Sequence, residues 1–126
     1  LYKVHQRVAK QFRKGRVFLC GDAAHVNNPI GGLGLNSGIH EAWDLAQLLT
    51  KERDLDRYER IRRPLNIEYV QEQTVANKKR LEEREPARRE ARFDELRGMA
   101  DDPAKHKAFL MRASLIESAR RAEALA

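Results

Sequence analysis

Residues 21–36 read GDAAHVNNPIGGLGLN and lie between two patterns that predict regular structure. Before them, residues 16–20 form an apolar, β-favouring run after one charge, which predicts a buried strand in a sheet covered on both faces. After them, residues 39–49 place apolar side chains at three- and four-residue steps, which predicts a helix. Five glycines and one proline from Gly21 to Gly38 prevent a regular element from running through the stretch. The sequence therefore predicts a strand, a glycine-rich loop and a helix.

The predicted helix carries one apolar face, which we expect to pack against a core. Its members are Ile39, Ala42, Trp43, Ala46 and Leu49. Asn36 or Ser37 can supply the side-chain oxygen that caps the start of the helix. Glu41 and Asp44 lie close enough to that start to interact favourably with the helix dipole.

Weaker patterns flank this unit. Residues 2–9 alternate loosely between apolar and polar, which suggests a half-buried strand or a strand followed by a turn. Asp54 or Asp56 can open a second helix, and Pro64 is expected to interrupt or restart it, because proline is costly inside a helix.

The last part of the chain predicts further helices. Residues 65–100 read as one or two polar helices broken near Pro86 and Gly98. Asp102 followed by Pro103 is typical of a helix start, with a capping residue before proline at the first helical position. The residues expected to line one face of that last helix are Phe109, Leu110, Ala113 and Ile116.

The chain has 126 residues, enough for one ordinary domain, but 35% are charged and only 6% are aromatic. We expect two parts: residues 1–53 as a strand, loop and helix unit, and residues 54–126 as a helical tail. The chain begins at Leu1 without a charged-then-apolar leader, so we interpret it as a fragment of a cytoplasmic protein. Its single cysteine excludes an internal disulfide framework.

The net charge of +6 raises the question of nucleic-acid binding. Residues 1–53 hold 8 basic and 4 acidic side chains, whereas residues 54–126 hold 17 and 15. The tail is therefore nearly balanced, which favours a solvated helix surface over a phosphate-binding stripe. No apolar run approaches the roughly 18 residues of a membrane span. We expect neither a nucleic acid nor a membrane as partner.

The loop has the features of a ligand site. Gly31, Gly32 and Gly34 permit positive φ angles and close approach of another molecule to the backbone. The start of the following helix presents unpaired N–H groups and a partial positive charge, which favour an electron-rich or anionic ligand. Asp22, at the strand end, can accept hydrogen bonds from vicinal hydroxyls. FAD combines a polyol chain with an electron-rich ring and phosphates.

The spacing of the motif resembles the second FAD-binding motif of the flavin-dependent aromatic hydroxylases, the para-hydroxybenzoate hydroxylase-like single-component monooxygenases. The matching residues are Gly21, Asp22, Ala23, Ala24, His25, Pro29, Gly31, Gly34 and Asn36. The resemblance implies an α/β parent fold of the Rossmann-like, FAD/NAD(P)-binding type, of which this chain would be a mostly α-helical part with one or two N-terminal strands. Asn28 stands where the family often has a first proline, and Glu41 where it often has aspartate.

The resemblance also implies cofactor contacts. Asp22, with Gly21 before it, would accept a hydrogen bond from the ribityl chain, and Pro29 would lie at the flavin ring with its carbonyl exposed. The backbone of the loop and first helical turn would pass along the pyrimidine edge of the ring and stabilise negative charge there. Those residues are Gly31, Gly32, Leu33, Gly34, Leu35 and Asn36. No catalytic side chain is identified.

The implied reaction is hydroxylation of a phenolic or related aromatic compound with FAD, NADPH or NADH, and molecular oxygen. The adenine and pyrophosphate of FAD need a Gly-x-Gly-x-x-Gly unit that this chain lacks, so an N-terminal part of the same enzyme is an expected partner. We expect the chain alone to bind FAD weakly or not at all. A related reductase, epoxidase or halogenase, a basic nucleic-acid-binding module and a non-catalytic remnant remain as alternatives.

Other reactive-looking residues have simpler interpretations. His25 and Cys20 are expected to be structural, and Trp43 to be part of a core. The cluster of Arg60, Arg62 and Arg63 is expected to form helix-surface ion pairs, with contact to a phosphate as the alternative. The histidines His5, His25, His40 and His106 lack paired ligand spacing, so no metal site is predicted.

Overall fold

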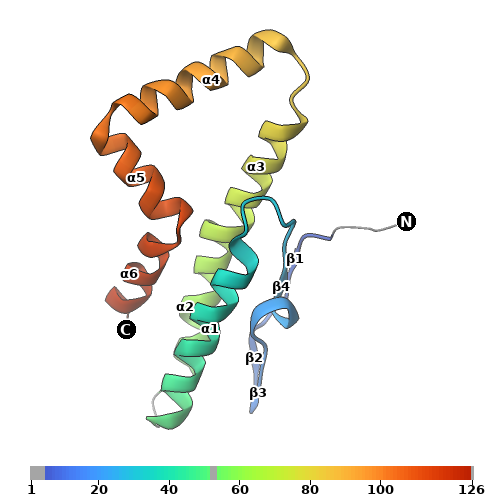
Figure 1. Ribbon diagram of the computed structural model, residues 1–126. Helices are drawn as coiled ribbons and strands as arrows, with labels where there is room; N and C mark the ends of the chain where they lie inside the picture. The colour runs from blue at the N-terminus through green and yellow to red at the C-terminus, as the bar shows by residue number, and fades with distance from the viewer. Residues whose placement is uncertain (1–4, 52–53, 126) are drawn as a thin grey trace.

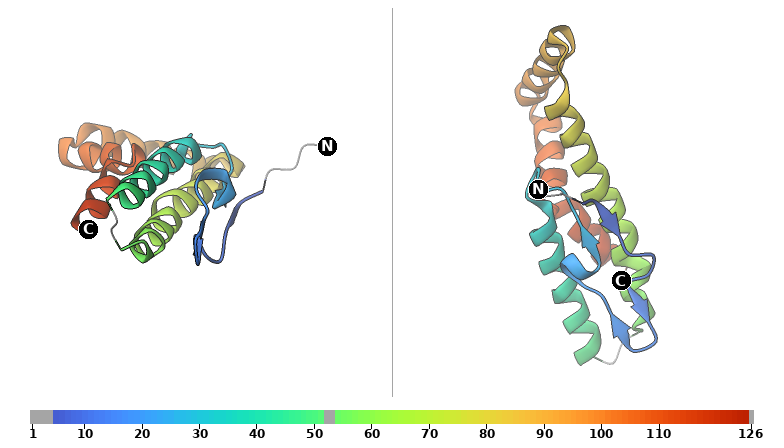
Figure 2. Two further views of the ribbon diagram at one scale, coloured as in Figure 1. Left: turned by 90° about the horizontal axis from the view of Figure 1, so that it is seen from below. Right: turned by 90° about the vertical axis from the view of Figure 1, so that its right-hand side faces the viewer.

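The computed structural model describes residues 5–51 and 54–125. Two antiparallel pairs of short strands lie along one side of a set of helices (Figures 1 and 2). β1 (Arg7–Val8) pairs with β4 (His25–Val26), and β2 (Arg13–Lys14) pairs with β3 (Val17–Phe18). A short 3-10 turn, η1 (Gly21–Ala23), connects β3 to β4. The helical elements in chain order are α1 (Leu33–Thr50), α2 (Asp56–Leu65), η2 (Asn66–Gln71), α3 (Glu72–Glu82), α4 (Pro86–Asp101), α5 (Pro103–Ala113) and α6 (Ile116–Ala124).

The prediction of a strand buried on both faces over residues 16–20 is wrong for this structure. Only Val17 and Phe18 form β3, and Val17 is 65% exposed. Among the described residues β3 pairs with β2 alone, through a tight turn in which Gly15 has φ +60°. A strand covered on both faces needs neighbours on both edges and a layer over each face. Of residues 2–9, positions 2–4 lie outside the described part, and in the remainder only Arg7 and Val8 form a strand, the half-buried β1.

Helix α1 begins three residues before the expected caps. Gly32, in the left-handed region at φ +64°, precedes its first residue, and Asn36 and Ser37 lie inside the helix. Asn36 Nδ2 donates to the Gly32 carbonyl (3.2 Å), so its side chain closes the first turn instead of capping it. The prediction of an Asn36 or Ser37 cap is therefore wrong, because two consecutive left-handed glycines end the loop earlier.

The apolar face predicted for α1 is also wrong. Ile39 and Trp43 are 56% and 66% exposed, whereas the buried residues are Leu33, Ser37, Glu41 and Leu48. Half of the buried face is therefore polar, and its side chains are buried because other side chains satisfy them. The spacing of the apolar residues therefore predicts the wrong buried face, the one opposite to Ser37 and Glu41.

Pro64 does not interrupt its helix. α2 continues into the π-helical segment η2 and then into α3, so one long rod runs from Asp56 to Glu82 (Figure 1). Pro64 is exposed, and the wider turns of η2 follow it directly. Such wide turns are a usual way for a helix to absorb a disturbed hydrogen-bond ladder.

The C-terminal helices fold back so that α6 packs against α2. The break near Pro86 is confirmed, but α4 runs straight through Gly98. The Asp102 cap is confirmed, because its side chain accepts hydrogen bonds from Ala104 N (2.9 Å) and Lys105 N (3.1 Å).

The predicted last helix is in fact two, because the chain turns at Leu115, which has φ +61°. This left-handed conformation costs about 1–2 kcal/mol for a residue with a side chain. Leu115 is only 1% exposed, and burial of a leucine offsets that cost. Leu110 and Ile116, which were expected on a packed face, are 51% and 43% exposed.

Two apolar clusters flank the contact between α1 and the α2 rod. The first contains Leu33, Ile61, Leu65, Tyr69, Val70, Leu115 and Ala122. The second contains Phe12, Ala24, Leu48 and Tyr58, and the Tyr58 hydroxyl donates to the Leu19 carbonyl (2.7 Å). Glu41 lies between Leu33 and Leu48 along α1, so the chain places a buried carboxylate between two apolar anchors.

Candidate functional site

The Gly21–Asp22 turn follows β3 and lies directly against α1. Gly21 has φ +58°, and a Cβ atom added to Gly38 of α1 would lie 3.1 Å from Gly21 Cα. The two backbones are therefore in contact, with no room for a side chain between them. Asp22, the next residue, is exposed to solvent.

The glycine-rich loop has the backbone that the sequence predicts. Gly31 and Gly32 have φ +98° and +64°, and Gly32 N donates to the Pro29 carbonyl (3.0 Å) across a four-residue turn. The Pro29 carbonyl, which was expected to be free for a ligand, thus already accepts one hydrogen bond. Asn28 Oδ1 accepts from Ile30 N (3.2 Å), so a side-chain hydrogen bond restrains the loop where the family often has a proline.

A hollow of about 420 Å³ lies between the turn and α1. Its lining residues are Gly21, Asp22, Gly34, Leu35, Gly38, Ile39 and Ala42. The hollow therefore brings together the Gly21–Asp22 turn and the first turn of α1, which are the two ends of the predicted motif. Pro29, Gly31, Gly32 and Asn36 are exposed in the adjoining loop and helix start. Leu33 differs, because its side chain is 4% exposed and belongs to the core, which leaves only its backbone for a ligand.

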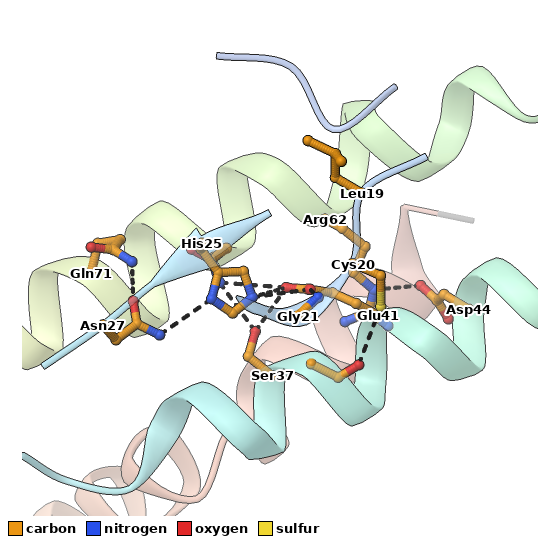
Figure 3. Close-up of polar contacts among 12 residues, drawn as sticks. Leu19, Cys20, Gly21, His25, Asn27, Ser37, Glu41, Asp44, Arg62 and Gln71 are labelled. Atoms are coloured by element: carbon orange, nitrogen blue, oxygen red, sulfur yellow. Dashed lines mark hydrogen bonds and ion pairs between the residues drawn. The ribbon is translucent and has the colours of Figure 1, made fainter. Parts of the chain in front are cut away.

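Glu41 is the centre of a buried polar network that reaches Gly21, one of the residues lining this hollow (Figure 3). Its side chain is 1% exposed, and its Oε2 accepts a hydrogen bond from Gly21 N (2.9 Å). Its Oε1 accepts from Ser37 Oγ (3.0 Å) and lies 2.8 Å from His25 Nε2. Asn66 Nδ2 also approaches Ser37 Oγ (3.2 Å) and Glu41 Oε1 (3.4 Å). The buried position of His25 within this network fits the structural role expected for it.

Sequence reasoning missed the partners of this network. No pattern in the sequence connects these partners, Asn27, Asn66 and Gln71, because they are ordinary polar residues at separate places in the chain. The one available signal was the spacing of Ser37 and Glu41, which places two polar side chains on the same face of α1.

The remaining singled-out residues have ordinary surroundings. Arg60 pairs with Asp54 at 3.1 Å on the surface, which confirms the expected ion pair. Arg62 Nε pairs with Asp44 Oδ2 of α1 at 2.5 Å, but Arg62 is buried, so this pair is not on the helix surface. Arg63 Nε instead donates to the Ala9 carbonyl (3.1 Å). Cys20 is half-buried, and burial together with the nearby negative charge of Glu41 raises the pKa of its thiol.

The described residues contain neither a metal-ion cluster nor a membrane-spanning helix. Within residues 5–51 and 54–125, no three histidine, cysteine, aspartate or glutamate side chains gather as a metal ion would require. None of the helices in that same part of the chain is sufficiently long and apolar to cross a membrane.

Comparison with known proteins places this geometry in a family. The model of a family described as an FAD binding domain matches residues 1–73, a span that includes the turn, the loop, α1 and the hollow. The chain belongs to this family. The α/β FAD-binding parent fold predicted from the sequence is thereby confirmed, with this chain supplying mostly helices and a few short strands.

Relatives of this chain are monooxygenases by name. Para-nitrophenol 4-monooxygenase of Pseudomonas sp. (strain WBC-3) is 43% identical over 95 residues, which are 70% of this chain and 24% of that protein. 6-hydroxy-3-succinoylpyridine 3-monooxygenase HspB of Pseudomonas putida is 42% identical over 92 residues, which are 68% and 23%. The crystal structure of p-nitrophenol 4-monooxygenase PnpA from Pseudomonas putida DLL-E4 superposes with a TM-score of 0.81 at 36% identity, covering 94% of this chain and 31% of that one. The chain thus spans about a quarter of the length of these curated relatives.

Proposed function

We propose that this chain is part of an FAD-dependent monooxygenase that hydroxylates a phenolic or related aromatic compound. NADPH or NADH would be the reductant and molecular oxygen the second substrate, and the cytoplasm the expected compartment. The observation that carries the proposal is the hollow that joins Asp22 to the first turn of α1, inside the span matched by the FAD-binding family. The relatives' names support hydroxylated aromatic rings as the substrate class.

The residues present suit FAD. Asp22 is an exposed carboxylate on one wall of the hollow, where it can accept hydrogen bonds from ribityl hydroxyls. On the other wall, Gly34 and Leu35 belong to the first turn of α1, whose backbone N–H groups have no partner within the helix. These N–H groups and the helix dipole favour negative charge on a ring held against them.

The bound flavin would supply the redox and oxygen chemistry. The contribution of this chain is to bind and orient one end of it. Gly21, Gly31 and Gly32 give the backbone its left-handed turns, and Leu33 anchors the helix start in the core. We retain the division into an FAD-binding part, 1–53, and a helical tail, 54–126, and an N-terminal part of the same protein would hold the adenine end.

The test is FAD binding by the longer protein that carries this chain, with Asp22→Ala as the variant. The wild type is expected to bind one FAD per protein, whereas residues 1–126 alone bind it weakly or not at all. Loss of a hydrogen bond to a charged group costs about 1.5–3 kcal/mol, so Asp22→Ala is expected to weaken FAD binding by roughly 10- to 150-fold. Titration of the apoprotein, followed by flavin fluorescence, measures the dissociation constant.

Asp101→Ala is the matched control, because Asp101 is an exposed aspartate at the far end of α4. It is expected to leave FAD affinity unchanged. A longer protein that binds no FAD would refute the proposed function. Equal affinities of the Asp22→Ala and Asp101→Ala variants would refute the role of Asp22.

A further inference from the structure

A line of hydrogen bonds runs from the long helical rod (Asp56 to Glu82) through β4 to α1 (Figure 3). Gln71 Nε2 donates to Asn27 Oδ1, and Asn27 Nδ2 lies 3.3 Å from His25 Nδ1. His25 Nε2 then lies 2.8 and 3.0 Å from the two oxygens of Glu41. We call the four side chains Gln71, Asn27, His25 and Glu41 the relay.

The relay has a fixed direction. Since Asn27 Oδ1 accepts from Gln71, the amide group of Asn27 presents its N–H to His25 Nδ1. His25 Nδ1 is therefore an acceptor, and the ring carries its proton on Nε2, which donates to Glu41. Every donor in the line points toward the carboxylate, and Glu41 is the one group that only accepts.

Two members of the relay, Glu41 and Asn27, contact residues on the two walls of the hollow. Glu41 Oε2 accepts from Gly21 N (2.9 Å), which holds the turn that carries Asp22. Asn27 Nδ2 lies 3.1 Å from the position that a Cβ atom on Gly34 would occupy, so it packs against the first turn of α1. Gly21 and Gly34 both line the hollow.

We propose that Glu41 is the positioning residue of the FAD site, and that the relay fixes the spacing between the Asp22 turn and the start of α1. The inference rests on the proposed function. His25 and Glu41 are each 1% exposed, so the hydrogen bond between them is shielded from bulk water. A buried hydrogen bond of this kind is rigid, and that rigidity holds Asp22 in place before a ligand arrives.

The proposal requires a carboxylate at position 41 for a reason of hydrogen-bond direction. In Glu41→Gln, one acceptor oxygen becomes an N–H₂ group that faces the N–H of Gly21 or of His25. Two donors then oppose each other in a buried place, and the turn must shift to separate them. FAD affinity of the longer protein is expected to fall about tenfold or more. Each 1.4 kcal/mol of binding free energy that is lost when the turn shifts lowers the affinity by a factor of ten.

A second substitution tests the direction itself. In the double variant Glu41→Gln with Asn27→Asp, the aspartate at position 27 accepts from His25 Nδ1–H and from Gln71. His25 Nε2 then accepts from the new glutamine, whose remaining oxygen accepts from Gly21 N. The second N–H of the glutamine replaces the acceptor of Ser37 Oγ and Asn66 Nδ2, so the Ser37 hydroxyl rotates and Asn66 turns its unpaired Oδ1 toward it. The relay is complete again with its direction reversed, so FAD affinity is expected to return to within about threefold of the wild type.

Thr74→Val is the matched control for stability. Thr74 is fully buried and its Oγ1 donates to the Val70 carbonyl (2.6 Å), but it has no part in the relay. For each variant, fluorescence titration gives the FAD dissociation constant, and thermal unfolding of the apoprotein gives its stability. Thr74→Val is expected to lower the unfolding temperature while leaving FAD affinity unchanged.

The outcomes separate the two proposals. The positioning role is supported if FAD affinity falls in Glu41→Gln, recovers in the double variant and is unchanged in Thr74→Val. The role is overturned if Glu41→Gln binds FAD like the wild type, if the double variant does not recover, or if Thr74→Val loses affinity equally. A wild type that binds no FAD overturns the proposed function as well.

Discussion

Replacement of His25 by alanine is expected to lower the free energy of unfolding by about 1.5–3 kcal/mol, the usual contribution of a hydrogen bond to a charged group. The side chains of His25 and Glu41 are 0% and 1% exposed, so water cannot take the place of the ring. Ser37, Asn66 and Gly21 N would still donate to the carboxylate, but the position left by the imidazole would be empty. Urea denaturation followed by circular dichroism measures the loss.

His106→Ala is the control for this experiment, because His106 is an exposed residue of α5. It is expected to change the free energy of unfolding by no more than about 0.5 kcal/mol. A loss below about 1 kcal/mol for His25→Ala would contradict a buried contact as strong as the geometry indicates.

Alanine substitutions at Gly38 and Gly98 are expected to act in opposite directions. Both glycines lie inside helices, where alanine is intrinsically better by about 0.8–1 kcal/mol. At Gly98 nothing lies within 4 Å of the added Cβ atom, so the helical gain is expected in full. At Gly38 the Cβ atom would lie 3.1 Å from Gly21 Cα, which is backbone and cannot rotate away.

The usual cost of overpacking, about 1–3 kcal/mol, opposes the helical gain at Gly38, so Gly38→Ala is expected to destabilise the protein by up to about 2 kcal/mol. Because the helical gain is common to both variants, their free energies of unfolding should differ by roughly 1–3 kcal/mol. Because the displaced atom belongs to the turn before Asp22, FAD affinity should fall for Gly38→Ala and stay unchanged for Gly98→Ala. A stabilising Gly38→Ala would show that the turn and α1 can separate without cost.

Features that depend on a few neighbouring residues could be predicted from the sequence. The Asp102 cap, the break before Pro86 and the left-handed glycines of the loop are all decided by local backbone chemistry. The position of Asp22 in a turn beside a helix start is local in the same sense, since Asp22 and Leu33, the first residue of α1, lie close in the sequence.

Features that depend on distant partners could not be predicted. Ser37 and Glu41 are buried because His25, Asn66 and Gly21 N form hydrogen bonds with them. A hydrophobicity pattern carries no information about hydrogen bonds to distant residues. The apolar residues of α1 consequently pointed to the wrong face.

The same reason applies to the turn at Leu115. Its left-handed backbone is stabilised by a core that residues of α1, α2 and η2 build. No local signal in the sequence around Leu115 indicates it.

The exposed face of α1 gives the chain an optical reporter. Trp43 is its single tryptophan and is 66% exposed, one residue beyond Ala42 and one helical turn beyond Ile39, both of which line the hollow. Its emission in residues 1–126 is expected to be red-shifted, as for an indole in water. A flavin ring entering the hollow would quench that emission by energy transfer, so a native residue can report occupancy of the site without any attached dye.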